Sequence, residues 1–189
     1  GVPSEIKANE NRVSMTPYAV RTLVDDGHRV LIQNNAGVKS GFTNDEYTSN
    51  GAIIVGTMDE IYNDSEMIVK VKEPQESEIS KIRDSQIIFT YFHFAASKNL
   101  TESIMKSNCI AFAYETVQTE NKNLPLLVPM SEIAGRLSVH NGAKCLESNQ
   151  GGRGVLLSGS TGIEPATVTI IGGGIVGSNA CRLAAGLGA

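Results

Sequence analysis

Short apolar runs rich in β-branched residues recur along the first part of the chain, and polar segments with helical spacing separate them. The runs predict strands at 30–33, 52–55, 67–74, 86–92 and 109–113, the third of them broken by Pro74. The segments between them predict helices that begin at Thr16-Pro17, at Thr43 and at Thr57, and further helices near 76–82 and 100–106. This alternation indicates an α/β fold, with a Rossmann-like parallel sheet covered by helices on both faces.

The pattern changes near residue 120. The stretch 121–125 is typical of a linker, and Pro129 precedes the longest helical pattern, at 130–149. Small residues within that helix predict close packing against a neighbour; they are Ala134, Gly135, Ser138, Gly142 and Ala143. The sequence Gly151-Gly-Arg-Gly154 does not directly follow a predicted strand. We therefore interpret it as a flexible segment after the end of the helix rather than as a phosphate-binding loop.

A glycine-rich turn lies near the carboxyl end. Residues 167–171 predict a strand buried on both faces, and Gly172, Gly174 and Gly177 then fit the pattern G-x-G-x-x-G before a helix of small residues. Such a turn lets a pyrophosphate approach the backbone at a helix N-terminus, although a tight strand-to-helix turn without a ligand has the same pattern. We therefore expect a substrate domain at 1–128, a connector helix at 129–149 and the beginning of a Rossmann dinucleotide-binding domain at 150–189.

Composition narrows the classes of function. The 189 residues carry a net charge of -4, with 41% hydrophobic and 19% charged residues, which argues against nucleic acid or an anionic membrane as a partner. Three widely spaced cysteines suggest no disulfide framework and no metal site, so a reducing, cytoplasmic setting is expected. One strand and one helix cannot bury their apolar faces alone, so we expect a fragment of a longer chain.

Charged residues at the predicted strand ends are candidates for a site, because ligands of open α/β sheets bind there. Lys70 and Lys72 interrupt an apolar strand, and either serves a ligand or extends its amine to solvent. Arg12 follows the first apolar stretch and can hold a carboxylate with two parallel hydrogen bonds, unless it is only a surface residue.

His93 ends the aromatic-rich strand, and its apolar neighbours would exclude bulk water around an acid/base group. A packed histidine with a purely structural role is the alternative. The other two histidines, His28 and His140, are interpreted as structural. A carboxylate clamp, a cationic donor, an acid/base and a dinucleotide turn together suggest an enzyme that oxidises a small carboxylate substrate.

The chain resembles the L-alanine dehydrogenase family along essentially its whole length, and corresponds to the amino-terminal half. The resemblance depends on five motifs: Gly1-Val-Pro3-x-Glu5 with Asn9-Glu10-x-Arg12-Val13-x-x-Thr16-Pro17, Lys70-Val-Lys72-Glu-Pro74, His93-Phe-Ala-Ala-Ser97, Tyr114-Glu-Thr-Val-Gln118 and Pro129-Met-Ser-Glu-x-Ala-Gly-Arg136. It implies reversible oxidative deamination of L-alanine by NAD to pyruvate and ammonia, in a cytoplasmic homo-oligomer that is usually hexameric. Another small 2-amino acid as substrate stays open.

By matching motif, Arg12 and Lys72 hold the substrate and His93 is the acid/base. Ser131 resembles a family contact to the cofactor, and the pyrophosphate would meet the backbone of Gly172, Gly174, Ile175, Val176 and Gly177. The family's later catalytic aspartate and its returning carboxyl-terminal segment are not in the sequence. The acidic residue that selects NAD over NADP is expected about 20 residues past the turn, beyond Ala189.

Two further hypotheses remain open. The related alpha subunit of proton-translocating transhydrogenase shares the fold, but it usually lacks the histidine after the aromatic strand and the Lys-Glu-Pro ending found here. The 189 residues could also be a natural truncated product that acts by association alone.

Overall fold

The computed structural model describes all residues from Gly1 to Ala189 and divides into two compact units, Gly1–Val117 and Gln118–Ala189. None of its helices combines the length and the apolar composition needed to cross a membrane.

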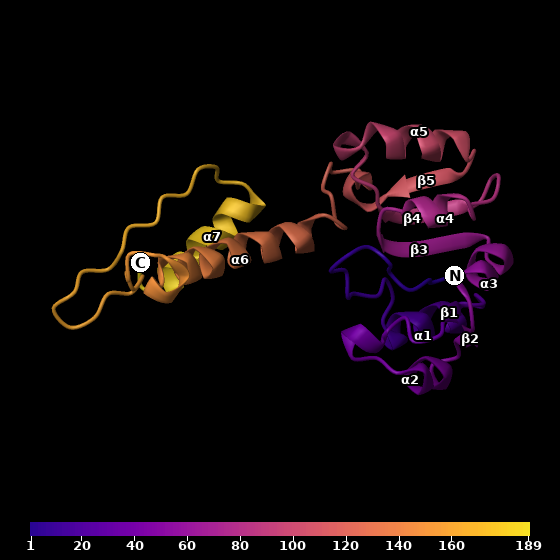
Figure 1. The fold of residues 1–189 in the computed structure, drawn as a ribbon, viewed down its shortest axis with the longest axis horizontal. Helices are drawn as coiled ribbons and strands as arrows, with labels where there is room; N and C mark the ends of the chain where they lie inside the picture. The colour runs from indigo at the N-terminus through magenta and orange to yellow at the C-terminus, as the bar shows by residue number, and fades with distance from the viewer. The chain divides into compact units, whose positions relative to one another are not determined.

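Helices and strands alternate through the first unit as predicted (Figure 1). In chain order they are α1 (Pro17–Asp25), β1 (Leu31–Gln33), α2 (Asn44–Ser49), β2 (Ile53–Val55), α3 (Met58–Asp64), β3 (Met67–Lys72), α4 (Glu76–Ile79), β4 (Ile87–Tyr91), α5 (Lys98–Lys106) and β5 (Ile110–Ala113). Short 3₁₀ turns lie at Val38–Ser40 (η1), Phe94–Ala96 (η2) and Tyr114–Thr116 (η3). The α/β prediction is confirmed. Strand β3 ends two residues before the predicted end at Pro74, which cannot donate to a strand ladder, and α4 ends three residues earlier than expected, with Ser80 as its C-cap.

Local capping explains where the helices begin. The Thr16 side chain accepts a hydrogen bond from the Ala19 N–H, and Pro17 occupies the first position of α1. Thr43 and Thr57 each form a capping box, with Glu46 and Glu60 respectively. All three predicted caps are therefore confirmed.

All strand pairs are parallel, in the orders β1-β2 and β3-β4-β5. The first two residues of the chain connect these two sheets. Val2 donates its N–H to the Leu31 carbonyl (2.8 Å) and accepts from Gln33 (2.9 Å), while the Gly1 carbonyl accepts from the Val69 N–H (2.9 Å). In Figure 1 the N-terminus accordingly lies between β1 and β3.

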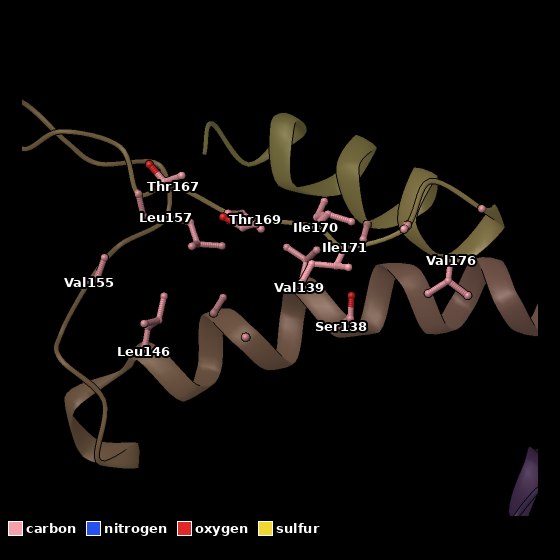
Figure 2. Close-up of a pocket in the computed structure, with 18 of the residues that line it drawn as sticks. Ser138, Val139, Leu146, Val155, Leu157, Thr167, Thr169, Ile170, Ile171 and Val176 are labelled. Carbon is pink, nitrogen blue, oxygen red and sulfur yellow. The ribbon is translucent and has the colours of Figure 1, made fainter.

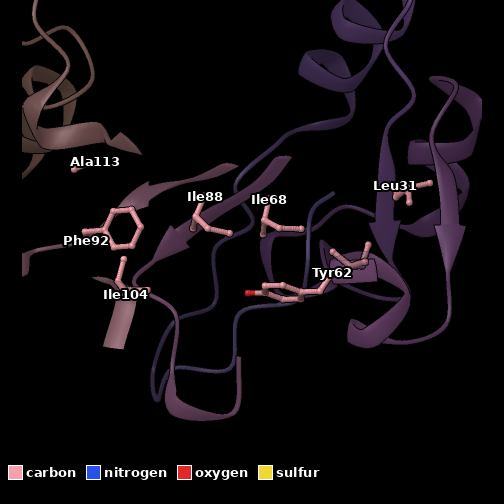
Figure 3. Packing of buried hydrophobic residues seen from close by; sticks show 8 residues of the cluster. Leu31, Tyr62, Ile68, Ile88, Phe92, Ile104 and Ala113 are labelled. Atoms are coloured by element: carbon pink, nitrogen blue, oxygen red, sulfur yellow. The ribbon is translucent and has the colours of Figure 1, made fainter. Parts of the chain in front are cut away.

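Two apolar clusters form the core of the first unit. Figure 3 shows the cluster in which Ile68 of β3 and Ile88 of β4 lie between Tyr62 of α3 and Phe92. A second cluster surrounds Val20, Ile32 and Tyr47, and the Tyr47 hydroxyl donates to the Met15 carbonyl (2.7 Å). Strand β5 departs from the prediction of a sheet covered on both faces, since Ile110 and Phe112 are nearly half exposed.

A buried ion cluster surrounds Lys70, in the second half of β3. Lys70 is fully buried, and its Nζ donates to Glu78 Oε1 (2.6 Å) and to Glu5 Oε2 (3.1 Å). The carboxylates are themselves buried, with side chains that are 2% and 0% exposed for Glu5 and Glu78. The interpretation that Lys70 extends its amine to solvent is therefore wrong, because two carboxylates from distant positions satisfy it in the interior.

The second unit consists of α6 (Val128–Leu146), a 3₁₀ turn at Ser148–Gln150 (η4) and α7 (Ile175–Gly186). The two helices pack around Val139, Ala180 and Ala184. Gly135 permits their close approach, since a Cβ there would collide with the Val176 carbonyl oxygen, whereas a Cβ at Gly142 would meet nothing within 4 Å. The predicted long helix and the close packing at Gly135 are confirmed, although α6 ends at Leu146 rather than at 149. Gly151, in the segment that follows, adopts φ +82°.

The predicted strand at 167–171 is not a strand. These residues form no sheet pairing in the structure, and Ile171 is 98% exposed. A strand exists only where neighbouring backbones complete its hydrogen-bond ladder, and no parallel neighbour lies beside this segment. The apolar sequence therefore adopts an extended path without the burial that the pattern predicted.

We expect Lys70→Met to lower the free energy of unfolding by about 3–5 kcal/mol, because the Glu5 and Glu78 carboxylates stay buried without their cation. Denaturant unfolding at neutral pH measures this. The loss should shrink at acidic pH, since burial raises the pKa of Glu78 and a protonated carboxyl needs no counter-charge.

The matched control is Lys98→Met, which removes an exposed i,i+4 pair with Glu102 and should change stability by less than about 0.5 kcal/mol. Equal effects of the two substitutions would show that the buried cluster contributes nothing specific.

Candidate functional site

A groove of about 940 Å³ lies in the second unit between α6, the extended segment 167–171 and the start of α7. In Figure 2, Ser138 and Val139 of α6 face the segment that carries Ile170 and Ile171. All six predicted cofactor-binding residues line this one groove; they are Ser131, Gly172, Gly174, Ile175, Val176 and Gly177. The structure thus brings together residues that lie more than 40 positions apart in the sequence.

The glycine turn has the backbone geometry that its sequence requires. Gly172 adopts φ +100°, a conformation that L-residues rarely take, and a Cβ on Gly173 or Gly174 would meet no atom within 4 Å. A Cβ on Gly177 would instead collide with the carbonyl oxygen of Gly172 and lie 2.9 Å from its carbonyl carbon. Gly177 is therefore needed for close packing of the helix on the turn, and Gly172 and Gly174 leave the backbone beside the groove free of side chains.

The N-terminus of α7 faces the groove without a side-chain cap. Gly174 is the N-cap residue and makes no side-chain hydrogen bond to the first turn. The helix runs for 12 residues, so its dipole and first-turn N–H groups favour an anion at this end. The groove therefore combines lining residues that are mostly apolar with a helix N-terminus that favours an anion.

Arg12 lies in the first unit, where its guanidinium is held by Glu10. Its Nε donates to Glu10 Oε1 (2.8 Å) and its Nη2 to Glu10 Oε2 (2.6 Å). This hydrogen-bonded pair lowers the pKa of Glu10 to about 2 and raises the pKa of Arg12. The Arg12 side chain is 45% exposed, so a ligand can reach it.

Lys72 ends β3 in a half-buried position, unlike the fully buried Lys70. Its N–H points to Glu5 Oε1 (3.4 Å), and its carbonyl accepts from the Thr90 hydroxyl (2.8 Å). The register between β3 and β4 shifts between Val69 and Lys72. The regular alternation of side chains between the two faces of a strand therefore does not fix how Lys70 and Lys72 are placed relative to each other. Lys72 also contributes to the lowered pKa of Glu10, and its charge therefore lies near the Glu10–Arg12 pair.

His93 follows β4 and has the left-handed conformation φ 52°, ψ 43°. Its N–H donates to Glu115 Oε1 (2.7 Å), and its ring stacks on Tyr91 with centroids 6.0 Å apart. The expectation that apolar neighbours would shield the imidazole is wrong for this chain, because His93 is exposed. The left-handed conformation ends the extended path of β4 at this residue, and the ring keeps its contact with Tyr91.

Tyr91 connects the three candidate residues of the first unit, and sequence reasoning missed it. It is the register partner of Lys72 across β3 and β4, and its ring stacks on His93. Burial raises the pKa of Tyr91, and the nearby charge of Arg12 opposes that rise. Arg12, Lys72 and His93 are therefore gathered around one aromatic side chain.

Glu10 and Glu115 were also missed, because only the fold brings their carboxylates to Arg12 and to the His93 backbone. A signal for Glu10 was present, since a glutamate two residues before an arginine in a polar loop can pair with it. No comparable signal links Glu115 to His93, which are 22 residues apart.

Comparisons with known proteins agree with one another. A family model described as "Alanine dehydrogenase/PNT, N-terminal domain" matches residues 1–134, and the corresponding C-terminal domain model matches residues 138–189. The chain is 51% identical to an alanine dehydrogenase of Methanococcus maripaludis and 49% identical to one of Bacillus subtilis, in both cases over all 189 residues. It spans about half the length of these curated relatives, 51% and 50%.

Solved structures give the same result for the fold. An L-alanine dehydrogenase structure superposes with a TM-score of 0.94 at 51% identity, covering 100% of this chain and 52% of the other. A transhydrogenase from Sinorhizobium meliloti superposes with a TM-score of 0.83 at 22% identity, covering 100% of this chain and 54% of the other, which establishes a shared fold alone.

We expect Gly177→Ala to destabilise the second unit by about 1–3 kcal/mol, because the new methyl group collides with the carbonyl group of Gly172 and the turn must open. Gly186→Ala in the same helix meets no atom within 4 Å and should stabilise by up to about 1 kcal/mol. Denaturant unfolding of the two variants compares one substitution at two positions. A change of the same sign in both would contradict the proposed close packing at Gly177.

Proposed function

Because the chain belongs to the alanine dehydrogenase/PNT family, we propose that it is the amino-terminal half of an L-alanine dehydrogenase. The reaction would convert L-alanine, NAD⁺ and water into pyruvate, ammonium, NADH and a proton, and would be reversible. The observation that carries the proposal is the gathering of Arg12, Lys72 and His93 around Tyr91.

The substrate carboxylate is the group that Arg12 and Lys72 would bind. Both side chains are cationic, and the charges of both act on Glu10. Two positive charges in the same neighbourhood can bind an anion such as a carboxylate. Lys72 would also donate to the carbonyl oxygen of pyruvate and polarise it for attack by ammonia. A small, singly charged 2-oxo acid matches this set of donors.

His93 would carry the protons of the reaction. In the direction of deamination its imidazole takes a proton from the water that attacks the imine carbon, and later donates a proton to the departing nitrogen. Its exposure lets it exchange protons with solvent between these steps. The hydrogen bond from the His93 backbone N–H to Glu115 fixes the main chain at this position, and the stack on Tyr91 orients the imidazole ring.

The groove in the second unit fits a dinucleotide. Three consecutive glycines leave the backbone accessible, and the uncapped start of α7 supplies N–H groups for a pyrophosphate. Ser131 of α6 would contact the cofactor from the opposite wall. NAD, when bound, supplies the acceptor for the hydride from the alanine Cα.

The proposal also covers the domain organisation of the protein. We propose that residues 1–128 form the substrate domain, that 129–149 connect it to the nucleotide domain, and that the latter begins at 150. As the resemblance implies, the enzyme would work as a cytoplasmic homo-oligomer.

The alternative is a nucleotide-binding component of a transhydrogenase, a class that shares the fold. The 51% identity to alanine dehydrogenase over the whole chain supports the dehydrogenase instead. The discriminating observation is turnover: a transhydrogenase component would bind NADH without any alanine-dependent reaction.

We expect the full-length protein that contains this chain to oxidise NADH in the presence of pyruvate and ammonia, and His93→Ala to reduce kcat by about 10²–10⁴-fold, because the positioned acid/base is lost. His140→Ala, an exposed histidine of α6, is the matched control and should retain wild-type rates. Equal rates for wild type and His93→Ala would remove His93 from the mechanism.

We expect Lys72→Met to raise the KM for pyruvate and to lower kcat, because the side chain would bind the substrate and polarise its carbonyl. The loss in kcat/KM should reach about 10²-fold or more, as for other removed electrostatic donors. Steady-state kinetics measures it, with the exposed Lys39→Met of η1 as the control. Unchanged kinetics in Lys72→Met would contradict the assigned role.

A further inference from the structure

We propose that Glu10 is a positioning residue of this site: its carboxylate fixes the Arg12 guanidinium in place before a substrate carboxylate binds. The inference rests on the proposed function, since it assigns a purpose to the orientation of Arg12.

Three hydrogen bonds join the two residues. Glu10 Oε1 accepts from Arg12 Nε (2.8 Å) and from the Arg12 backbone N–H (2.9 Å), and Glu10 Oε2 accepts from Arg12 Nη2 (2.6 Å). Two parallel bonds along one edge of the guanidinium fix both its position and its plane. A single bond would leave the plane free to rotate.

Glu10 is held more firmly than the residue it binds. Its side chain is only 7% exposed, against 45% for Arg12. A tight turn presents it: Asn9 adopts φ 64°, and the Glu10 N–H donates to the Lys7 carbonyl (3.1 Å). The buried carboxylate therefore anchors the exposed cation.

The charges of two cations that would bind the substrate, Arg12 and Lys72, both act on Glu10. Arg12 and Lys72 both lower the pKa of Glu10, which falls to about 2, so the carboxylate stays charged at neutral pH. Two like charges repel when no anion lies near them, and Glu10 supplies that anion in the substrate-free protein. Arg12 is therefore oriented before binding, and little conformational entropy is lost when the ligand arrives.

This role predicts a specific kinetic signature. Glu10→Gln keeps the shape of the side chain but removes its charge and one of the two oxygens that accept from the guanidinium, so Glu10 would hold the orientation of Arg12 less firmly. Because Arg12 binds the substrate carboxylate in the ground state as well as the transition state, the KM for pyruvate should rise by about tenfold or more, with a smaller change in kcat. Glu10→Asp retains the charge at a shorter reach and should give an intermediate KM.

A double-mutant cycle in the full-length protein tests whether Glu10 acts through Arg12. Steady-state kinetics with pyruvate, ammonia and NADH would be compared for wild type, Glu10→Gln, Arg12→Ala and the double variant. If Glu10 positions Arg12, Glu10→Gln should change KM by less than about twofold in the Arg12→Ala background. An effect of the same size in both backgrounds would overturn the inference.

The control is Glu60→Gln, a carboxylate that caps α3, which should leave the pyruvate KM unchanged. Thermal unfolding of each variant identifies misfolded protein, and if Glu10→Gln does not fold, the same cycle is run with Glu10→Asp. An active wild type with an unchanged pyruvate KM in the folded Glu10 variant overturns this inference alone. A wild type without alanine-dependent turnover overturns the proposed function itself.

Discussion

The buried ion cluster of Lys70 with Glu5 and Glu78 is the interaction on which the first unit depends. Lys70 comes from the middle of β3, Glu5 from the amino-terminal segment and Glu78 from the first turn of α4. Each carboxylate also accepts backbone hydrogen bonds: Glu5 from Val71 (2.6 Å), and Glu78 from Gln75 (2.8 Å). A cluster in which every charge has several partners can stay buried, and it ties three separate segments to one point.

The candidate site is built on this cluster. The Glu5 carboxylate also faces the Lys72 N–H, so the end of β3 that carries Lys72 is held by the same group that neutralises Lys70. Two further contacts hold the amino-terminal segment against β3: the Lys7–Glu73 ion pair and the hydrogen bond from the Ser14 hydroxyl to the Val69 carbonyl (2.7 Å). Arg12 lies between Lys7 and Ser14 in the sequence, so both contacts restrain its backbone. Its backbone is thus positioned by the fold, and its side chain by Glu10.

The elements could be predicted from the sequence wherever a local signal decides them. The threonine caps at positions 16, 43 and 57 have local sequence signals, as do the β-branched runs of the first unit, and these predictions were confirmed. The contact of Lys70 with Glu5 could not be predicted, since the two residues are 65 positions apart and only the fold brings them together. The prediction of a strand at 167–171 was wrong for a related reason. The composition of this segment is that of a buried strand, but burial and strand pairing depend on neighbouring strands that are distant in the sequence.

The two halves of the proposed chemistry have different structural requirements. The glycine turn needs only a local backbone path and one close contact, between Gly177 and Gly172, and so it forms even where residues 167–171 lack a sheet. The substrate residues need long-range contacts, because Arg12, Lys72 and His93 meet only when two parallel strands and the amino-terminal segment are in register. A change that shifts β3 against β4 should therefore impair the substrate residues while the glycine turn stays intact, because no hydrogen bond within that turn depends on the first unit.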